Sequence, residues 1–157
     1  MEHISPPPLS DVKNALEMAI SRLLQKDHHL LAANASERSL THWLAIHLMP
    51  FFKNYEVDCE YNRDGFDVKK LMLNERPVVD TQLEAVTVFP DIIVHRRGSN
   101  NYNLLVVEVK KSKSAEGSGY DLMKLKAFKE ELNYTYAAHV ILGEQSPGKL
   151  IYEINWQ

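Results

Sequence analysis

The segment from residue 89 to 112, FPDIIVHRRGSNNYNLLVVEVKKS, places charged side chains inside runs of apolar residues. Asp91 lies at the start of one apolar run, and Glu108 and Lys110 lie near the end of the next. An ionised group is costly to bury unless it is paired or binds a metal. The pattern therefore indicates either a structural ion pair or a site that binds a cation.

The two apolar runs predict β-strands at residues 86–95 and 103–111, joined by the polar turn RGSNNY. Successive side chains of a strand point to opposite faces of its sheet. Glu108 and Lys110 are therefore expected on one face of the second strand. Lys111 is expected on the other face, toward solvent or a helix.

A turn centred between Ser99 and Asn100 predicts that Asp91 lies directly opposite Glu108 in an antiparallel pair. Side chains in such positions have Cβ atoms about 4.5–5.5 Å apart, and like charges there repel each other. Two carboxylates at that distance share a proton or hold a cation, and their oxygens suit Mg²⁺. Lys110 can reach the same point. The simpler alternative is an ion pair between Lys110 and one of the carboxylates.

Three amphipathic helices are expected around these strands. Ser10 is expected to cap the first helix, and Asn34 followed by Glu37 resembles the capping box that begins a second. The third helix is expected over residues 120–132. Their apolar stripes, at helical spacing, are Val12, Leu16, Ala19, Ile20, Leu23 and Leu24; Leu40, Trp43, Leu44, His47, Leu48 and Phe51; and Leu122, Leu125, Phe128 and Leu132.

Further strands are expected at residues 55–61, 135–143 and 149–156. The order of elements is then two helices, a three-stranded meander, a crossover helix and two more strands. This order favours an α/β (α+β) fold in which helices flank a mixed central sheet.

The chain of 157 residues is expected to be a single domain, 1–157, with a flexible tail at 1–9 and an insertion or mobile loop at 62–85. No run is apolar and long enough to suggest a membrane span, and no secretory signal is visible. The single cysteine suits a reducing compartment, so the cytoplasm is expected.

The net charge of −3 does not by itself indicate a polyanionic partner. Residues 91–130 nevertheless contain eight Lys or Arg and five Asp or Glu, so the charge of this part is +3 and that of the remainder is −6. A locally basic part could bind phosphate groups, although an ordinary solvated surface explains it equally well. The basic residues considered for such a footprint are Arg96, Arg97, Lys113, Lys124, Lys126 and Lys129.

Pro90-Asp91 followed by Glu108-Val109-Lys110, on neighbouring strands between two helices, resembles the PD-(D/E)xK nuclease superfamily. The resemblance covers most of residues 36 to 143. It implies a restriction-endonuclease-like αβββαβ core, here with an extra N-terminal helix and C-terminal strand. It also implies that Asp91 and Glu108 bind Mg²⁺, for which Mn²⁺ can substitute, while Lys110 orients or activates the attacking water.

The implied activity is hydrolysis of nucleic-acid phosphodiester bonds, most simply by a DNA endonuclease. RNA remains open as the substrate, since chemistry at phosphate does not choose the sugar. A catalytically inactive binding or scaffolding module of the same fold is the alternative. Specificity would come from residues 62–85, from a homodimer or from a partner protein.

Two more residues are considered for the site. Glu37 lies on the sheet-facing stripe of its helix and could be an additional catalytic and metal-binding carboxylate, or it could serve only the capping box. Tyr120 opens the third helix, where some relatives place a polar side chain beside the site; plain packing is the alternative.

Overall fold

The computed structural model describes residues 4–61, 63–64, 67–68, 70–72, 85–114 and 117–157. The helices in these ranges are α1 (Leu9–Lys26), α2 (His28–Ala32), α3 (Glu37–Leu48), the 3₁₀ turn η1 (Met49–Phe51) and α4 (Gly119–Leu132). The strands are β1 (Glu56–Cys59), β2 (Arg63–Asp64), β3 (Asp67–Val68), β4 (Lys70–Met72), β5 (Ala85–Thr87), β6 (Ile92–His95), β7 (Leu105–Lys111), β8 (Tyr136–Ser146) and β9 (Lys149–Trp156).

A mixed five-stranded sheet in the order β1-β6-β7-β8-β9 forms the centre of the molecule. The meander β1-β6-β7 is antiparallel, β7 pairs with β8 in parallel, and β9 returns antiparallel to β8. Helix α4 makes the crossover that a parallel pair requires. Strand β7 lies in the middle of the sheet, and its first six residues are buried, as expected for a strand covered on both faces.

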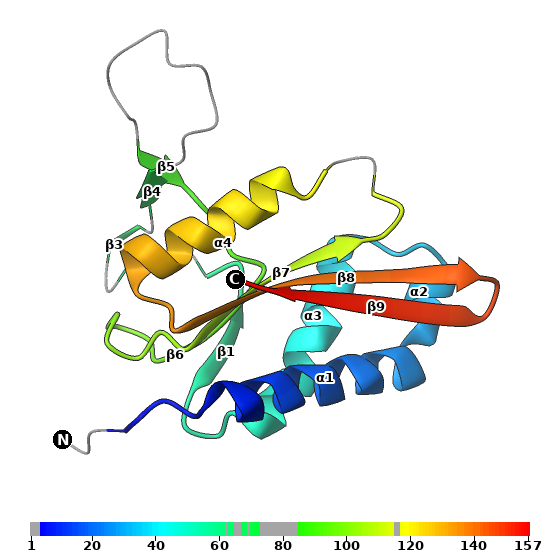
Figure 1. Ribbon diagram of the computed structural model, residues 1–157, viewed down its shortest axis with the longest axis horizontal. Coiled ribbons are helices and arrows are strands. Elements are labelled where there is room, and N and C mark those ends of the chain that lie inside the picture. The colour runs from blue at the N-terminus through cyan, green and yellow to red at the C-terminus, as the bar shows by residue number, and fades with distance from the viewer. Residues whose placement is uncertain (1–3, 62, 65–66, 69, 73–84, 115–116) are drawn as a thin grey trace, which may run out of the picture.

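Helices cover both faces of this sheet (Figure 1). On one face α1 and α3 pack over a large core cluster, to which β7 contributes Leu105, Val107 and Val109. On the other face α4 packs through Leu125 and Phe128 against a smaller cluster that includes Val106. The expected mixed sheet flanked by helices is therefore confirmed, and so is the alternation of faces along β7.

The register expected for the central hairpin is also confirmed. Ile92 pairs with Val107 and Val94 pairs with Leu105. One step further along the same register sets Asp91 against Glu108.

The expected helix caps are wrong at two positions. The first helix begins at Leu9 after Pro8, so Ser10 lies inside its first turn. The second predicted helix is α3, and its N-cap is Ser36, whose Oγ accepts a hydrogen bond from the Ser39 N–H at 3.2 Å. Asn34 instead follows the short helix α2 with φ 53°, the left-handed conformation that asparagine tolerates after a helix end.

The strand predicted over residues 86–95 is interrupted. Residues 85–87 form β5, which pairs with β4 in a separate small sheet, and the chain joins the central sheet only at Ile92. Pro90, which has no N–H for a ladder, lies in the break. The segment 62–85, expected as an insertion or loop, contributes β2, β3, β4 and the first residue of β5, and its other residues lie outside the described ones.

Two expectations concern the ends of the chain and the membrane. The part of the predicted 1–9 tail that is described has no regular structure before α1, and the carbonyl of Pro7 accepts a hydrogen bond from the Tyr136 hydroxyl at 3.0 Å. None of the helices in the described ranges combines the length and the apolar character that a bilayer span needs.

Truncation of Phe128 tests the packing of α4 on the sheet. Its side chain is fully buried, and replacing a buried phenylalanine by alanine costs about 3–5 kcal/mol. We expect Phe128→Ala to lower the free energy of unfolding by that amount in urea denaturation followed by circular dichroism. Lys126→Ala on the exposed side of the same helix is the control, for which a change below about 0.5 kcal/mol is expected. Equal stability of the two variants would contradict the placement of α4.

Candidate functional site

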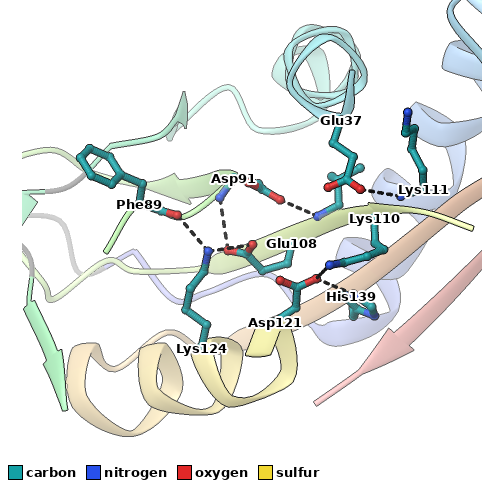
Figure 2. Close-up of polar contacts among 10 residues, drawn as sticks. Glu37, Phe89, Asp91, Glu108, Lys110, Lys111, Asp121, Lys124 and His139 are labelled. Atoms are coloured by element: carbon teal, nitrogen blue, oxygen red, sulfur yellow. Dashed lines mark hydrogen bonds and ion pairs between the residues drawn. The ribbon is translucent and has the colours of Figure 1, made fainter. Parts of the chain in front are cut away.

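Asp91 and Glu108 lie opposite each other where the chain enters β6. The end of β1 fixes this entry, because the N–H of Glu60 donates to the Pro90 carbonyl at 2.9 Å. The N–H of Asp91 donates to Glu108 Oε1 at 3.3 Å, and the N–H of Val109 donates to Asp91 Oδ2 at 2.8 Å. Each carboxylate thus accepts a hydrogen bond from the backbone of the opposite segment, and the two side chains converge as predicted (Figure 2).

Lys124 of α4 provides the positive charge that lies closest to this pair. Its Nζ is 3.0 Å from Glu108 Oε2 and donates to the Phe89 carbonyl at 3.0 Å. Glu108 is 2% exposed and Lys124 is 8% exposed, so the ion pair is removed from water. The ring of Tyr120, one turn earlier on α4, has its centroid 5.8 Å from Lys124 Nζ. Tyr120 therefore borders the site, which is one of the two positions expected for it; plain packing was the other.

Lys110 contacts a different carboxylate. Its Nζ is 3.2 Å from Asp121 Oδ2, and the same oxygen is 3.2 Å from His139 Nε2. All three side chains lie on the α4 side of the sheet, and His139 is next to Glu108 in the parallel register of β7 and β8 (Figure 2). Lys110 therefore belongs to the same cluster as Glu108, yet its ion pair is with the helix.

Glu37 projects from the first turn of α3 toward the end of β7 (Figure 2). Its Oε1 accepts a hydrogen bond from the Lys111 N–H at 3.3 Å. The Lys111 side chain turns to the α3 side, as predicted, and donates to Asn34 Oδ1 and to the Ala35 carbonyl at 2.9 and 3.1 Å. Glu37 thus fixes the end of the strand, and the capping box expected with Asn34 is wrong.

Burial is the largest influence on the pKa of both carboxylates of the pair. Burial raises the pKa of Glu108 well above its usual range, and the nearby Asp91 carboxylate raises it further, whereas Lys124 lowers it. Burial also raises the pKa of Asp91, against the lowering effects of the Val109 N–H, of Lys124 and of a hydrogen bond with Glu108. Although burial lowers the pKa of Lys124, the neighbouring carboxylates raise it by more, so Lys124 stays charged.

The donor set fits a hard divalent cation. Burial and the nearby Asp91 raise the pKa of Glu108, and a positive charge between the two converging carboxylates favours their ionised forms. Mg²⁺ commonly uses one or two carboxylates and completes its octahedron with water and substrate phosphate oxygens. Asp91 and Glu108 could supply that pair. Within the described residues, no three His, Cys, Asp or Glu side chains are grouped so as to hold one metal ion. Glu37 accepts a hydrogen bond from the Lys111 N–H, and its part as a metal ligand stays a prediction.

The basic residues considered for a footprint take different positions. Lys124 points inward to Glu108, Lys129 donates to the Gln157 carbonyl at 2.8 Å, and Lys126 is exposed. Arg97 pairs with Asp58, and Arg96 donates to the Asn54 carbonyl at 3.1 Å.

A polar cleft of about 570 Å³ opens at the end of β7, beyond Lys110. Asn34, Lys111, Ser112, Lys113 and Glu144 are among its lining residues. Two of the lysines in the segment 110–113 thus line a hollow, which they share with residues of α2 and the following loop and not with the residues that pair with Glu108 and Lys110.

The roles of three members of the cluster are not among the predictions from the sequence. Asp121 and His139 carry no predicted role, and Lys124 is predicted to lie on a solvated helix face or in a nucleic-acid footprint. A signal was available for the helix residues, because Asp121 and Lys124 lie four positions before the buried Leu125 and Phe128 and hence on the same face.

Comparisons of the chain with protein-family models, with curated proteins and with solved structures find no match.

Replacing Lys124 tests the buried ion pair directly. Removing one partner of a buried pair leaves an uncompensated charge and costs about 3 kcal/mol or more. We therefore expect Lys124→Met to be destabilised by about that amount in urea denaturation without divalent ions. Glu108→Gln combined with Lys124→Met should recover part of the loss, because no buried charge then lacks a partner. Lys126→Met is the control; equal stability of Lys124→Met and Lys126→Met would refute the pairing.

Proposed function

We propose that this chain is a metal-dependent nuclease of the PD-(D/E)xK kind, and most simply a Mg²⁺-dependent DNA endonuclease of the cytoplasm. One observation carries the proposal above all others. Asp91 and Glu108, from adjacent segments of the sheet, bring their carboxylates together at the entry to β6. A buried pair of like charges requires compensation, and binding a divalent cation is a chemical reason for keeping it.

The order of the elements supports the same proposal. Helix α3, the meander β1-β6-β7, helix α4 and the parallel strand β8 follow one another as in the αβββαβ core that the resemblance implies. In this interpretation α1 and β9 are the additional N-terminal helix and C-terminal strand of a restriction-endonuclease-like fold.

The residues of the cluster divide the proposed work between them. Asp91 and Glu108 would hold the cation. A bound Mg²⁺ would supply neutralisation of charge at the scissile phosphate and a water of lowered pKa. An ammonium group beside that phosphate stabilises the charge that develops in the transition state. The resemblance gives Lys110 the role of orienting or activating the attacking water, close to the same phosphate. Lys124 is a second candidate for stabilising the developing charge, because it already contacts Glu108.

The cleft at the end of β7 offers a path for the nucleic-acid backbone. Lys111 and Lys113 line it within three residues of Lys110. Contacts of lysine with phosphates carry no sequence information, so this surface supports affinity for DNA or RNA alike.

A second candidate function is a binding or scaffolding module without catalysis. The observation in its favour is that the cluster is already paired within the protein, Lys124 with Glu108 and Lys110 with Asp121. In this view the four charges hold α4 on the sheet and have no further role.

Nuclease assays separate the two functions. We expect the purified protein to cleave plasmid, linear or branched DNA, or RNA, with Mg²⁺ or Mn²⁺ present, and to lose this activity in EDTA. Asp91→Asn and Glu108→Gln should abolish cleavage together with the heat of Mn²⁺ binding in calorimetry. Lys110→Met should lower the rate by about 10²–10³-fold, as loss of one transition-state contact does.

Lys126→Met, on the exposed side of α4, is the matched control and should cleave like the unaltered protein. Absence of cleavage on every substrate, together with absence of heat from Mn²⁺, would favour the scaffolding function.

A further inference from the structure

The outer edge of the sheet at β9 is a second surface of interest. Strand β9 pairs with β8 along one side, and no strand in the described ranges pairs along the other. It is eight residues long, and Lys149–Trp156 contains no proline. The irregularity of the β8–β9 ladder lies between Glu144 and Ser146 of β8, so β9 itself is regular. A long regular edge with free N–H and C=O groups is a template for another strand.

The ladder with β8 decides which backbone groups of β9 face outward. The N–H of Gln157 donates to the Ala137 carbonyl at 2.9 Å, and Trp156 is in register with Ala138. In an antiparallel pair the residues that exchange hydrogen bonds alternate with those that do not. The odd-numbered residues of β9 therefore bond to β8, and the even-numbered ones, including Tyr152, present their N–H and C=O groups to the open side.

The side chains along this edge are apolar in the middle and charged at two positions. Ile151 is 41% exposed and Tyr152 is 44% exposed, on opposite faces of the strand. Lys149 and Glu153 share the face of Ile151, each two residues away from it. The strand thus carries opposite charges placed symmetrically about Ile151.

We infer that β9 pairs antiparallel with β9 of a second copy of the chain, about a twofold axis at Ile151. In this register Leu150 meets the partner's Tyr152, and both present outward backbone groups that can exchange hydrogen bonds. Lys149 meets the partner's Glu153, and the symmetry makes two such ion pairs. The two sheets of five strands become one continuous sheet.

Other registers pair the charges and the outward backbone groups of β9 less completely. A shift of one residue sets outward-facing backbone groups against groups already bonded to β8. A shift of two residues in one direction sets Lys149 against the partner's Asn155, and in the other direction it sets Glu153 against Pro147. The register centred on Ile151 alone pairs both charges and both sets of hydrogen-bonding groups, as an isologous interface requires.

Sedimentation of the full chain over a range of concentrations tests the inference. We expect a dimer that dissociates on dilution, since pairing along a single edge buries less surface than a permanent interface. Tyr152→Pro should abolish it, because proline removes an outward N–H that β8 does not use, and an edge strand tolerates proline there. Tyr152→Val keeps that N–H and should still dimerise. Circular dichroism establishes that both variants are folded.

A charge exchange tests the register itself. Lys149→Glu sets like charges opposite each other twice and should weaken the dimer by about tenfold. Adding Glu153→Lys exchanges the two charges, recreates both pairs and should restore the dissociation constant. Lys126→Glu, on α4 away from the edge, is the control for net charge and should leave it unchanged.

The inference is overturned if the unaltered chain is monomeric at every concentration, in which case Lys149 and Glu153 only protect the edge. It is also overturned if folded Tyr152→Pro dimerises like Tyr152→Val, or if the exchanged pair fails to restore association. These readouts measure mass and not cleavage, so they are independent of the proposed nuclease activity.

Discussion

The carboxylate of Glu108 lies in the middle strand of the sheet with almost no contact with water, and the surrounding structure compensates it. Lys124 supplies the opposite charge, and the Asp91 N–H supplies a hydrogen bond. These contacts offset part of the cost of burying an ionised Glu108. The compensation fixes α4 and the entry to β6 relative to β7, so one buried group determines the positions of two neighbouring elements.

The buried face of α4 has two parts as a result. Leu125 and Phe128 pack against the apolar half of β7, whereas Asp121 and Lys124 meet the charged half, where Lys110 and Glu108 lie. Apolar residues of α4 therefore face apolar residues of β7, and charged residues of α4 face charged residues of β7. Buried ion pairs contribute less to stability than apolar contacts of the same size, which makes a purely structural reason for the charged half weak.

The sequence was sufficient to predict the hairpin register. The position of the turn and the alternation of apolar residues together favour one register, in which Asp91 faces Glu108. It was also sufficient for the order of the main elements, because apolar residues at helical spacing and alternating apolar residues distinguish the helices from the strands. The cap expected at Asn34 failed where neighbouring contacts outweighed local preference: Asn34 adopts the left-handed conformation after α2, and its amide oxygen accepts a hydrogen bond from Lys111. The partners of Lys110 and Glu108 lie on α4, and no local pattern specifies which helix residue meets which strand residue.

Two ion pairs join α4 to β7, and in each pair the helix residue and the strand residue have opposite signs. Asp121 is negative where Lys110 is positive, and Lys124 is positive where Glu108 is negative. A substitution at one of these positions is therefore tolerated only with a matching change at the other. In descendants of this chain in which position 108 or 110 does change, position 124 or 121 respectively should change with it. Such paired exchange would reveal the helix–strand contact from sequences alone.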